Sequence, residues 1–219
     1  MTDRDPTPDE ILAFWFPDGP DPEPDAHIGL WEWRMRGGAH AEVVARFSGA
    51  TERAAAGEFD AWAGTPRGRL ALIILLDQFS RSVWQGTPRA FAQDPKALAL
   101  CLEGLDNGDF DALENAWQKA TFKLPLVHCE CPGHLANLDR NLALAARIAE
   151  EAPERLRPMY RNMARRQAPA VRAVIAAFGR HPHRNVILGR ASTPEEAEYL
   201  ARGAFPHQSD MRKLARDDP

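Results

Sequence analysis

Apolar residues recur at a helical spacing along most of the chain, and recognisable cap residues mark where helices begin. In four places a side-chain acceptor precedes a proline: Thr7-Pro8, Thr65-Pro66, Asp94-Pro95 and Thr193-Pro194. Proline at the first helical position loses no hydrogen bond, because the first N–H groups of a helix have no partner within it. Glu10 and Glu196, three residues after Thr7 and Thr193, complete capping boxes. The four sites are therefore predicted helix starts.

The periodic segments predict an all-α fold of about eight helices, arranged as an antiparallel helical-hairpin array. The expected ranges are about 8 to 16, 39 to 56, 66 to 84, 95 to 106, 111 to 126, 134 to 151, 154 to 178 and 194 to 202. Pro158 and Pro169 are expected to kink or split the long range that contains them. Residues 17 to 24 are predicted to form a rigid extended connection. We expect one domain over residues 1–219, with a frayed tail over 203–219.

The predicted helix over residues 66 to 84 is apolar on all sides in its middle, which indicates that other helices surround it. Its apolar run, Leu70 to Leu76, is far shorter than the ~20 residues needed to cross a bilayer. Asp77 and Arg81 lie four residues apart on one face, and Gln78 adjoins them. A buried ion pair needs further partners. The pair either braces the core or takes part in binding a ligand, and the sequence leaves both interpretations open.

The composition and charge of the chain argue against several classes of protein. The 219 residues carry a net charge of -4 with 44% hydrophobic residues, so the chain can bury a substantial core and has no basic field suited to nucleic acid or anionic lipid. Three cysteines argue against a disulfide framework, and the acidic start MTDRDPTPDE lacks the basic and apolar regions of a secretory signal. We expect a cytoplasmic protein that has neither nucleic acid nor membrane as a partner. Its oligomeric state is left open.

The segment FGRHPHRNVILGRAST, residues 178–193, is dense in hydrogen-bond donors. Gly179 is predicted to end the preceding helix in the left-handed conformation. Five side chains follow that suit a carboxylate or phosphate: Arg180, His183, Arg184, Asn185 and Arg190. The helix that starts at Thr193 adds partial positive charge nearby. The competing interpretation is that these groups tie carbonyl oxygens and helix ends together.

The stretch HCECPGH, residues 128–134, combines ligand types that bind zinc. A deaminase-type site would need a second P-C-x-x-C pair, and no C-x-x-C exists in the chain. A structural zinc site built on Cys129, Cys131, His134 and a remote ligand remains an alternative. We predict no metal and no other cofactor, and interpret the stretch as a loop that opens the next helix.

Long strings of this sequence resemble a bacterial family called domain of unknown function nine-two-four. The strings are LALIILLDQFSRSVWQGTPRAFAQDPKALAL and FGRHPHRNVILGRASTPEEAEYL, with ILAFWF and TPRGRL before them, and they cover about Ile11 to Leu200. The resemblance implies an all-helical, tetratricopeptide-like fold and names no activity. It also implies a polar set: Arg69, Asp77, Gln78, Arg81, Asp94, His128, Glu130, Arg180, His183, Arg184, Asn185, Arg190, Ser192 and Glu195. Cys129, Cys131 and His134 depart from the family pattern, so a zinc site there would be private to this protein.

Together these residues predict a cleft beside the central helix that binds a small anionic metabolite, with acid–base catalysis as a further possibility. The candidate catalytic residues are Asp77, His128, Glu130 and His183, and the candidate ligand-binding residues are Arg69, Gln78, Arg81, Arg180, Arg184, Asn185 and Arg190. One alternative is a tetratricopeptide-like scaffold that binds a protein or peptide partner, with the polar cluster purely structural. Another is a helical module without a ligand of its own. The sequence does not establish whether the protein is an enzyme.

Overall fold

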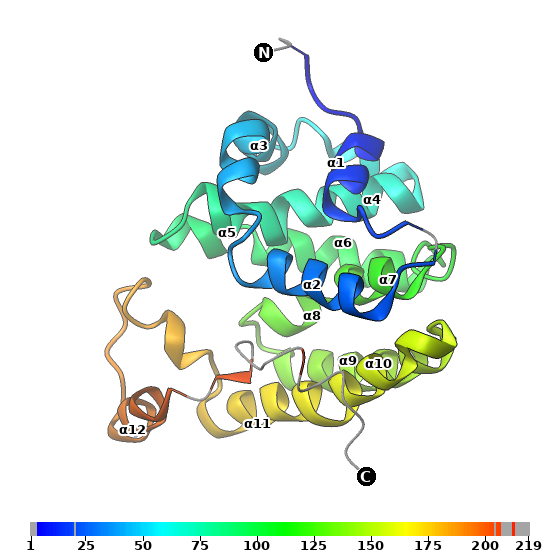
Figure 1. Cartoon of the computed structure of the whole chain (residues 1–219). Coiled ribbons are helices and arrows are strands. Elements are labelled where there is room, and N and C mark those ends of the chain that lie inside the picture. The colour runs from blue at the N-terminus through cyan, green and yellow to red at the C-terminus, as the bar shows by residue number, and fades with distance from the viewer. Residues whose placement is uncertain (1–3, 20, 204, 207–211, 213–219) are drawn as a thin grey trace.

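The computed structural model describes residues 4–19, 21–203, 205, 206 and 212, and every regular element in these residues is helical (Figure 1). The α-helices are α1 (Pro8–Trp15), α2 (Pro24–Met35), α3 (His40–Ala55), α4 (Pro66–Ile73), α5 (Ser80–Val83), α6 (Asp94–Asp106), α7 (Ala116–Phe122), α8 (Pro125–His128), α9 (His134–Glu151), α10 (Arg157–Asn162), α11 (Ala168–Phe178) and α12 (Pro194–Arg202). Two π-helical segments, Ile74–Phe79 and Met163–Gln167, join α4 to α5 and α10 to α11. The predicted all-α class is confirmed.

Side-chain caps form the helix starts at three of the four predicted positions. Thr7 and Thr193 each accept the N–H three residues later, and Glu10 and Glu196 complete both capping boxes. Thr65 accepts the N–H of Gly68 at 3.1 Å. The fourth prediction is off by one residue, because Asp94 is the first residue of α6 rather than its N-cap. Its carboxylate binds arginines from two other segments instead of the backbone of its own helix.

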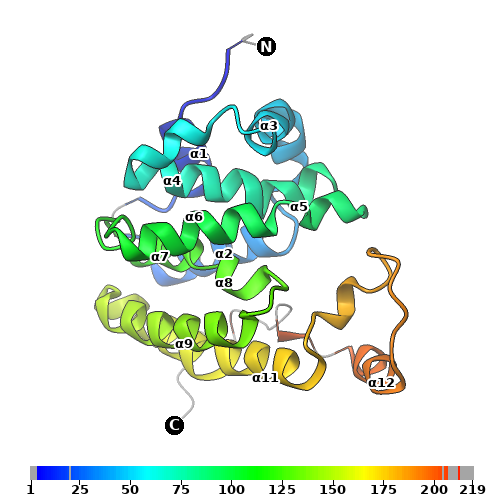
Figure 2. The ribbon, with the colours of Figure 1, turned by 180° about the vertical axis from the view of Figure 1, so that it is seen from behind.

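The continuous rod of α4, the π-segment Ile74–Phe79 and α5 lies at the centre of one layer of helices. It packs against α1, α3 and α6, as the views from the front and from behind both show (Figures 1 and 2). A second layer is formed by α9 with α10 and α11, and α7 and α8 connect the two layers. Residues Leu70 to Leu76 are fully buried, so the predicted enclosure of this rod is confirmed.

Helix α2 was not predicted. Its buried positions His27, Ile28, Trp31 and Arg34 follow a helical spacing, but two of the four are polar, which hides the apolar pattern. His27 and Arg34 are buried because both bind the Asp18 carboxylate, at 2.6 Å in the case of His27 Nδ1. The expected extended connection over residues 17 to 24 therefore contributes a buried carboxylate and the first residue of α2.

The other differences arise from prolines and from a cap that was not recognised. The helix expected over 111 to 126 begins only at Ala116, because Asn115 caps it by accepting the N–H of Gln118 at 3.1 Å. Pro125 then starts the short helix α8. The predicted split of the range 154 to 178 is confirmed, with α10 and α11 on either side of a π-segment. Most of the tail expected to fray, residues 204 and 207–219 except 212, lies outside the described residues.

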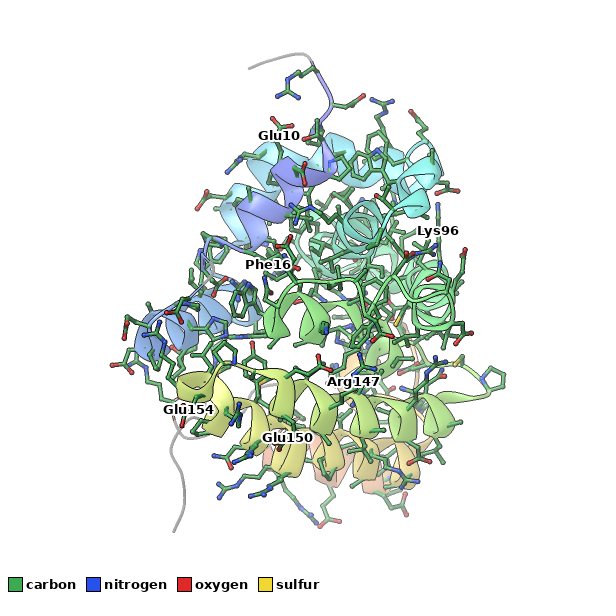
Figure 3. The ribbon with its side chains drawn as sticks, turned by 90° about the vertical axis from the view of Figure 1, so that its right-hand side faces the viewer. Glu10, Phe16, Lys96, Arg147, Glu150 and Glu154 are labelled. Atoms are coloured by element: carbon green, nitrogen blue, oxygen red, sulfur yellow. The ribbon has the colours of Figure 1, made fainter. Side chains whose placement is uncertain are left out.

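Charged side chains cover the outer faces of the helices. Arg147 and Glu150, labelled in Figure 3, lie on α9, where Arg147 pairs with Glu151 at 2.8 Å and Glu150 pairs with Arg161 at 3.0 Å. Such exposed pairs contribute little to stability. Within the described ranges, no helix has both the length and the apolar character required to span a bilayer.

Candidate functional site

Asp77 and His128 form a hydrogen-bonded pair at the centre of the molecule. Asp77 lies in the π-segment of the central rod and is fully buried. His128 is the last residue of α8, and its Nδ1 donates to the Asp77 carboxylate at 2.8 and 2.9 Å. Gln78 donates to the same carboxylate at 2.5 Å. The predicted contact between the central rod and the 128 region is therefore confirmed.

The Asp77 carboxylate is held in its charged form. Burial alone would raise its pKa, but the charge and hydrogen bond of His128, with the Arg81 charge, outweigh burial and lower its pKa to about 2. A carboxylate that accepts a hydrogen bond from Nδ1–H fixes the tautomer and orientation of the imidazole ring. His128 also lines a cavity, so its other ring nitrogen, Nε2, is available to interact with a molecule bound there.

Asp94 joins two arginines from distant parts of the chain. Its carboxylate accepts from Arg81 Nη2 at 2.5 Å and from Arg184 Nη1 at 2.9 Å. Both guanidinium groups lie over the ring of Phe91, at 4.8 and 4.4 Å from its centroid. Arg81 also lies 3.5 Å from Asp77, so the two buried carboxylates and the two arginines form one continuous network.

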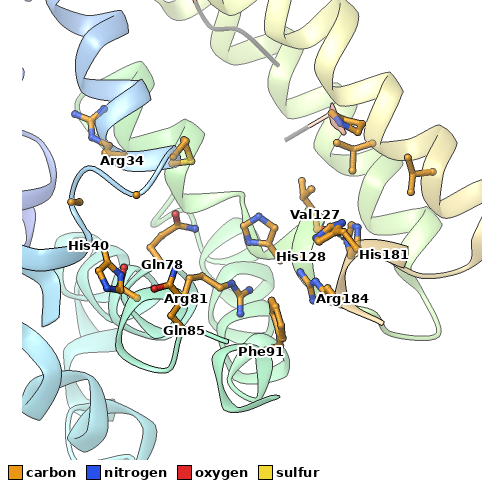
Figure 4. A pocket seen from close by; sticks show the side chains of 18 of the residues that line it. Arg34, His40, Gln78, Arg81, Gln85, Phe91, Val127, His128, His181 and Arg184 are labelled. Atoms are coloured by element: carbon orange, nitrogen blue, oxygen red, sulfur yellow. Dashed lines mark hydrogen bonds between the residues drawn. The ribbon is translucent and has the colours of Figure 1, made fainter. Parts of the chain in front are cut away.

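Arg81, Arg184 and His128 line one side of a cavity of about 330 Å³ between the two helical layers. Figure 4 shows Gln78, Arg81, His128 and Arg184 converging on it from the central rod, α8 and the segment after α11. Among the described residues, its polar lining consists of Arg34, Arg81, Arg184, His40, His128, His181, His183, Gln78, Gln85, Ser82 and Tyr199. No carboxylate occurs among these lining residues, because Asp18, Asp77 and Asp94 lie behind the basic groups that they neutralise.

His181 is a cavity residue that the sequence analysis did not identify. Its Nε2 donates to the carbonyl oxygen of Val127 at 2.9 Å, and burial, together with the charge of Arg184, lowers its pKa. His181 is therefore neutral, and its ring lies 5.4 Å from that of His183. The signal that could have revealed it is the following proline, Pro182, which favours the extended backbone seen at His181.

Several predicted site residues hold the loop after α11 in place and do not line the cavity. Glu130 accepts the backbone N–H of His181 at 2.6 Å and pairs with Arg190. Arg190 also donates to Asn185 at 3.1 Å. Arg180 binds Glu196 at 2.6 Å, and Asn185 donates to both Ser192 and Glu196. Of the two neighbouring glutamates in α12, Glu196 takes part in these contacts and is buried, whereas Glu195 is exposed.

The structure places Arg69 away from the cavity, near the start of the central rod. Its guanidinium donates to Asp109 at 2.7 Å and to Glu103 at 3.1 Å, and also to two backbone carbonyl oxygens. These contacts connect α4 to α6 and to the loop that follows α6. Arg69 is therefore assigned to packing, while Asp77, Gln78, Arg81, His128, His183 and Arg184 from the predicted set meet at or beside the cavity.

The HCECPGH stretch forms a loop and the start of α9. His134 Nε2 donates to the Val127 carbonyl oxygen at 3.0 Å, and burial raises the pKa of the Cys129 thiol to about 12. Cysteine binds zinc as the thiolate, so the raised pKa disfavours Cys129 as a zinc ligand. In the part of the chain that the structure describes, no group of three or more His, Cys, Asp or Glu side chains is placed to hold a metal ion.

Comparison with other proteins identifies the family. Residues 11–204 match the family described as "Bacterial protein of unknown function (DUF924)". A solved structure of a protein of unknown function from Agrobacterium tumefaciens is similar to this chain, with 30% sequence identity and a TM-score of 0.66 over 90% of this chain and 97% of that chain. No curated protein matches the chain. The chain belongs to DUF924, the bacterial family that its sequence motifs resemble.

Proposed function

We propose that the protein binds a small anionic metabolite in the 330 Å³ cavity, with Arg81 and Arg184 as its anchors. The observation that carries the proposal is the orientation of charge: basic groups and neutral donors face the cavity, and their counter-carboxylates lie behind them. An anion that enters gains attraction from the arginines without meeting a like charge on the described lining. Arg184 Nε and Arg34 Nη1 are buried and have no hydrogen-bond acceptor among the described residues.

The Asp77–His128 pair equips the same site for proton transfer. The carboxylate orients the ring through Nδ1, and Nε2 is the atom that would exchange a proton with a bound molecule. His128 is partly accessible, with 26% of its side chain exposed, whereas Asp77 is inaccessible. We propose general acid–base catalysis by His128, with Asp77 as the group that positions it.

A protein or peptide scaffold is less well supported. Binding a peptide in a concave groove requires a contiguous apolar or aromatic surface. Among the described residues, the exposed large hydrophobic side chains are Val44, Leu135 and Val186, which lie on α3, on α9 and in the loop before α12. Side chains so dispersed do not form a docking surface.

A cytoplasmic location is part of the proposal. Cys101, Cys129 and Cys131 are free thiols in the structure. Cytoplasmic proteins keep their cysteines reduced, and three thiols without a disulfide agree with such a compartment.

The proposal is tested by a thermal-shift screen of metabolite anions against the wild type, Arg184→Met and Arg180→Met. Both arginines are ion-paired and lie in one segment, but only Arg184 lines the cavity. An anion at ten times its Kd stabilises the native state by about 1.4 kcal/mol. This stabilisation should occur in the wild type and in Arg180→Met and should disappear in Arg184→Met. Equal loss in the two variants, or no stabilisation of the wild type by any anion, would refute the proposal.

His128→Asn separates binding from catalysis. The asparagine amide can replace Nδ1 as donor to Asp77, but it offers nothing at the position of Nε2. The variant should keep the anion-induced stabilisation and lose proton exchange with the ligand, measured by deuterium incorporation from heavy water. A variant that exchanges protons at the wild-type rate would remove His128 from the mechanism.

A further inference from the structure

A second cavity of about 130 Å³ adjoins the first. Met35, Val127, His128 and Val171 line both cavities, so the Asp77-bound imidazole lies at the boundary between them. The rest of the second cavity is formed mainly by apolar side chains of α2, α7, α9 and the α10–α11 region. A molecule held by the arginines of the first cavity can therefore extend past His128 into an apolar space.

Lys123 is an unusual member of this second lining. It follows the last residue of α7, and its Nζ donates to Asn141 Oδ1 at 2.6 Å. Among the described residues, no carboxylate pairs with it, and none lines the second cavity. Burial lowers the pKa of the Lys123 ammonium to about 8, so most of it is still protonated at neutral pH.

Ordinary structural explanations do not account for this ammonium. The other two lysines among the described residues have carboxylate partners, as Lys96 has Asp60 at 2.6 Å and Lys119 has Glu151 at 2.6 Å. Lys123 is half-buried, and its position at a helix C-terminus favours a cation only weakly, because α7 is short. The amide oxygen of Asn141 supplies one acceptor for three donors. The site lacks an anion, which a ligand would supply.

We propose, on the basis of the function proposed above, that the two cavities form one site for an elongated molecule with an oxyanion at each end. Arg81 and Arg184 bind one end, the apolar middle passes between Met35, Val127 and Val171, and Lys123 pairs with the other end. His128 then faces the middle of the bound molecule, where its Nε2 reaches the carbon atoms between the two acidic groups. The substrate class is therefore a dianion with an apolar spacer, such as a dicarboxylate.

The test compares dicarboxylates from succinate to sebacate with monocarboxylates of the same carbon number, by calorimetric titration of the wild type, Lys123→Met and Lys96→Met. Methionine keeps the length of the lysine stem and removes its charge, and Lys96 lies outside both cavities. In the wild type and in Lys96→Met, one chain length should bind about tenfold or more tightly as the diacid than as the monoacid. Lys123→Met should lose this preference and keep its affinity for the monoacid. Circular dichroism checks the fold, and Lys123→Gln replaces the methionine variant if that variant is unfolded.

The outcomes separate this inference from the proposed function. If monoacids bind the wild type as tightly as diacids at every chain length, the proposed role of Lys123 is wrong, whereas the proposed anion site at Arg81 and Arg184 is unaffected. Retention of the diacid preference in Lys123→Met would lead to the same conclusion. Absence of binding by every acid would overturn this inference, and the screen of other anions then decides whether the proposed function is also wrong.

Discussion

Replacing Asp94 by asparagine should strongly destabilise the protein. The carboxylate is 4% exposed and neutralises Arg81 and Arg184 at 2.5 and 2.9 Å. Asparagine preserves the size and one acceptor but leaves the buried guanidinium of Arg184 without a counter-charge. Breaking a buried pair in this way costs about 3 to 5 kcal/mol. The loss of a negative charge in the first turn of α6 adds at most about 1 kcal/mol.

The expected change in melting temperature follows from the size of the chain. One kcal/mol corresponds to about 2 to 4 °C for a domain of this length. Asp94→Asn should therefore lower the melting temperature by roughly 6 to 24 °C, measured by far-ultraviolet circular dichroism. The control is Asp139→Asn, which breaks the exposed Arg172–Asp139 pair at 2.5 Å and should cost less than about 1 kcal/mol. Similar melting temperatures for the two variants would refute the assignment of Asp94 as a buried counter-ion.

The same variant also distinguishes a binding site from a structural brace. With Asp94 neutral, Arg184 lacks a negative partner and Arg81 keeps only the 3.5 Å contact with Asp77, so an inorganic anion in the cavity should stabilise Asp94→Asn more than it stabilises the wild type. Sulfate is a suitable probe, with chloride at equal ionic strength as the control for screening. If sulfate raises both melting temperatures equally, the arginines do not bind an anion in the cavity and only stabilise the fold.

Three further predictions concern other parts of the structure. Asp77→Asn should destabilise the protein near neutral pH and much less near pH 2. The pKa of Asp77 is lowered to about 2, so the contribution of its charge to the free energy of unfolding is present above about pH 4 and is lost as the pH falls through 2. Urea denaturation across this pH range measures the difference. Gly68→Ala should cost about 1 to 3 kcal/mol in thermal denaturation, because its Cβ would lie 2.2 Å from the Trp62 carbonyl oxygen. In timed alkylation with mass spectrometry, Cys131 should react before Cys101 in the native protein, since Cys101 is buried and its pKa is raised to about 12.

Local signals in the sequence predicted those parts of the fold that depend on local interactions. Thr7, Thr65 and Thr193 each satisfy a helix start through a residue only three positions away, so the sequence contains the whole interaction. Helix α2 lacks such a signal, because the burial of His27 and Arg34 depends on Asp18, which lies outside the helix. Asp94 was assigned to its own helix for the same reason, although its partners are 13 and 90 residues away.

The sequence predicted the types of residue that form the candidate site better than it predicted which individual residues belong to it. Asp77, His128 and Arg184 stand out as ionisable groups in or beside apolar segments, and packing brings them together. Glu130 and Arg190 have the same chemistry, but they pair with each other. Their separate role depends on the path of the loop after α11, and no local pattern specifies that path.

The positions of the charged site residues within their helices and turns favour a role in ligand binding over a purely structural role in the core. Asp77 lies in a π-turn, Asp94 is the first residue of α6, His128 is the last residue of α8, and Arg184 ends a 3₁₀ turn, Pro182–Arg184. A π-turn interrupts regular helical hydrogen bonding and is frequent at functional sites. Here it places Asp77 against His128 and lets the next residue, Gln78, line the cavity. Charges that only braced the core would need no access to a cavity, whereas Arg81, His128 and Arg184 all face one.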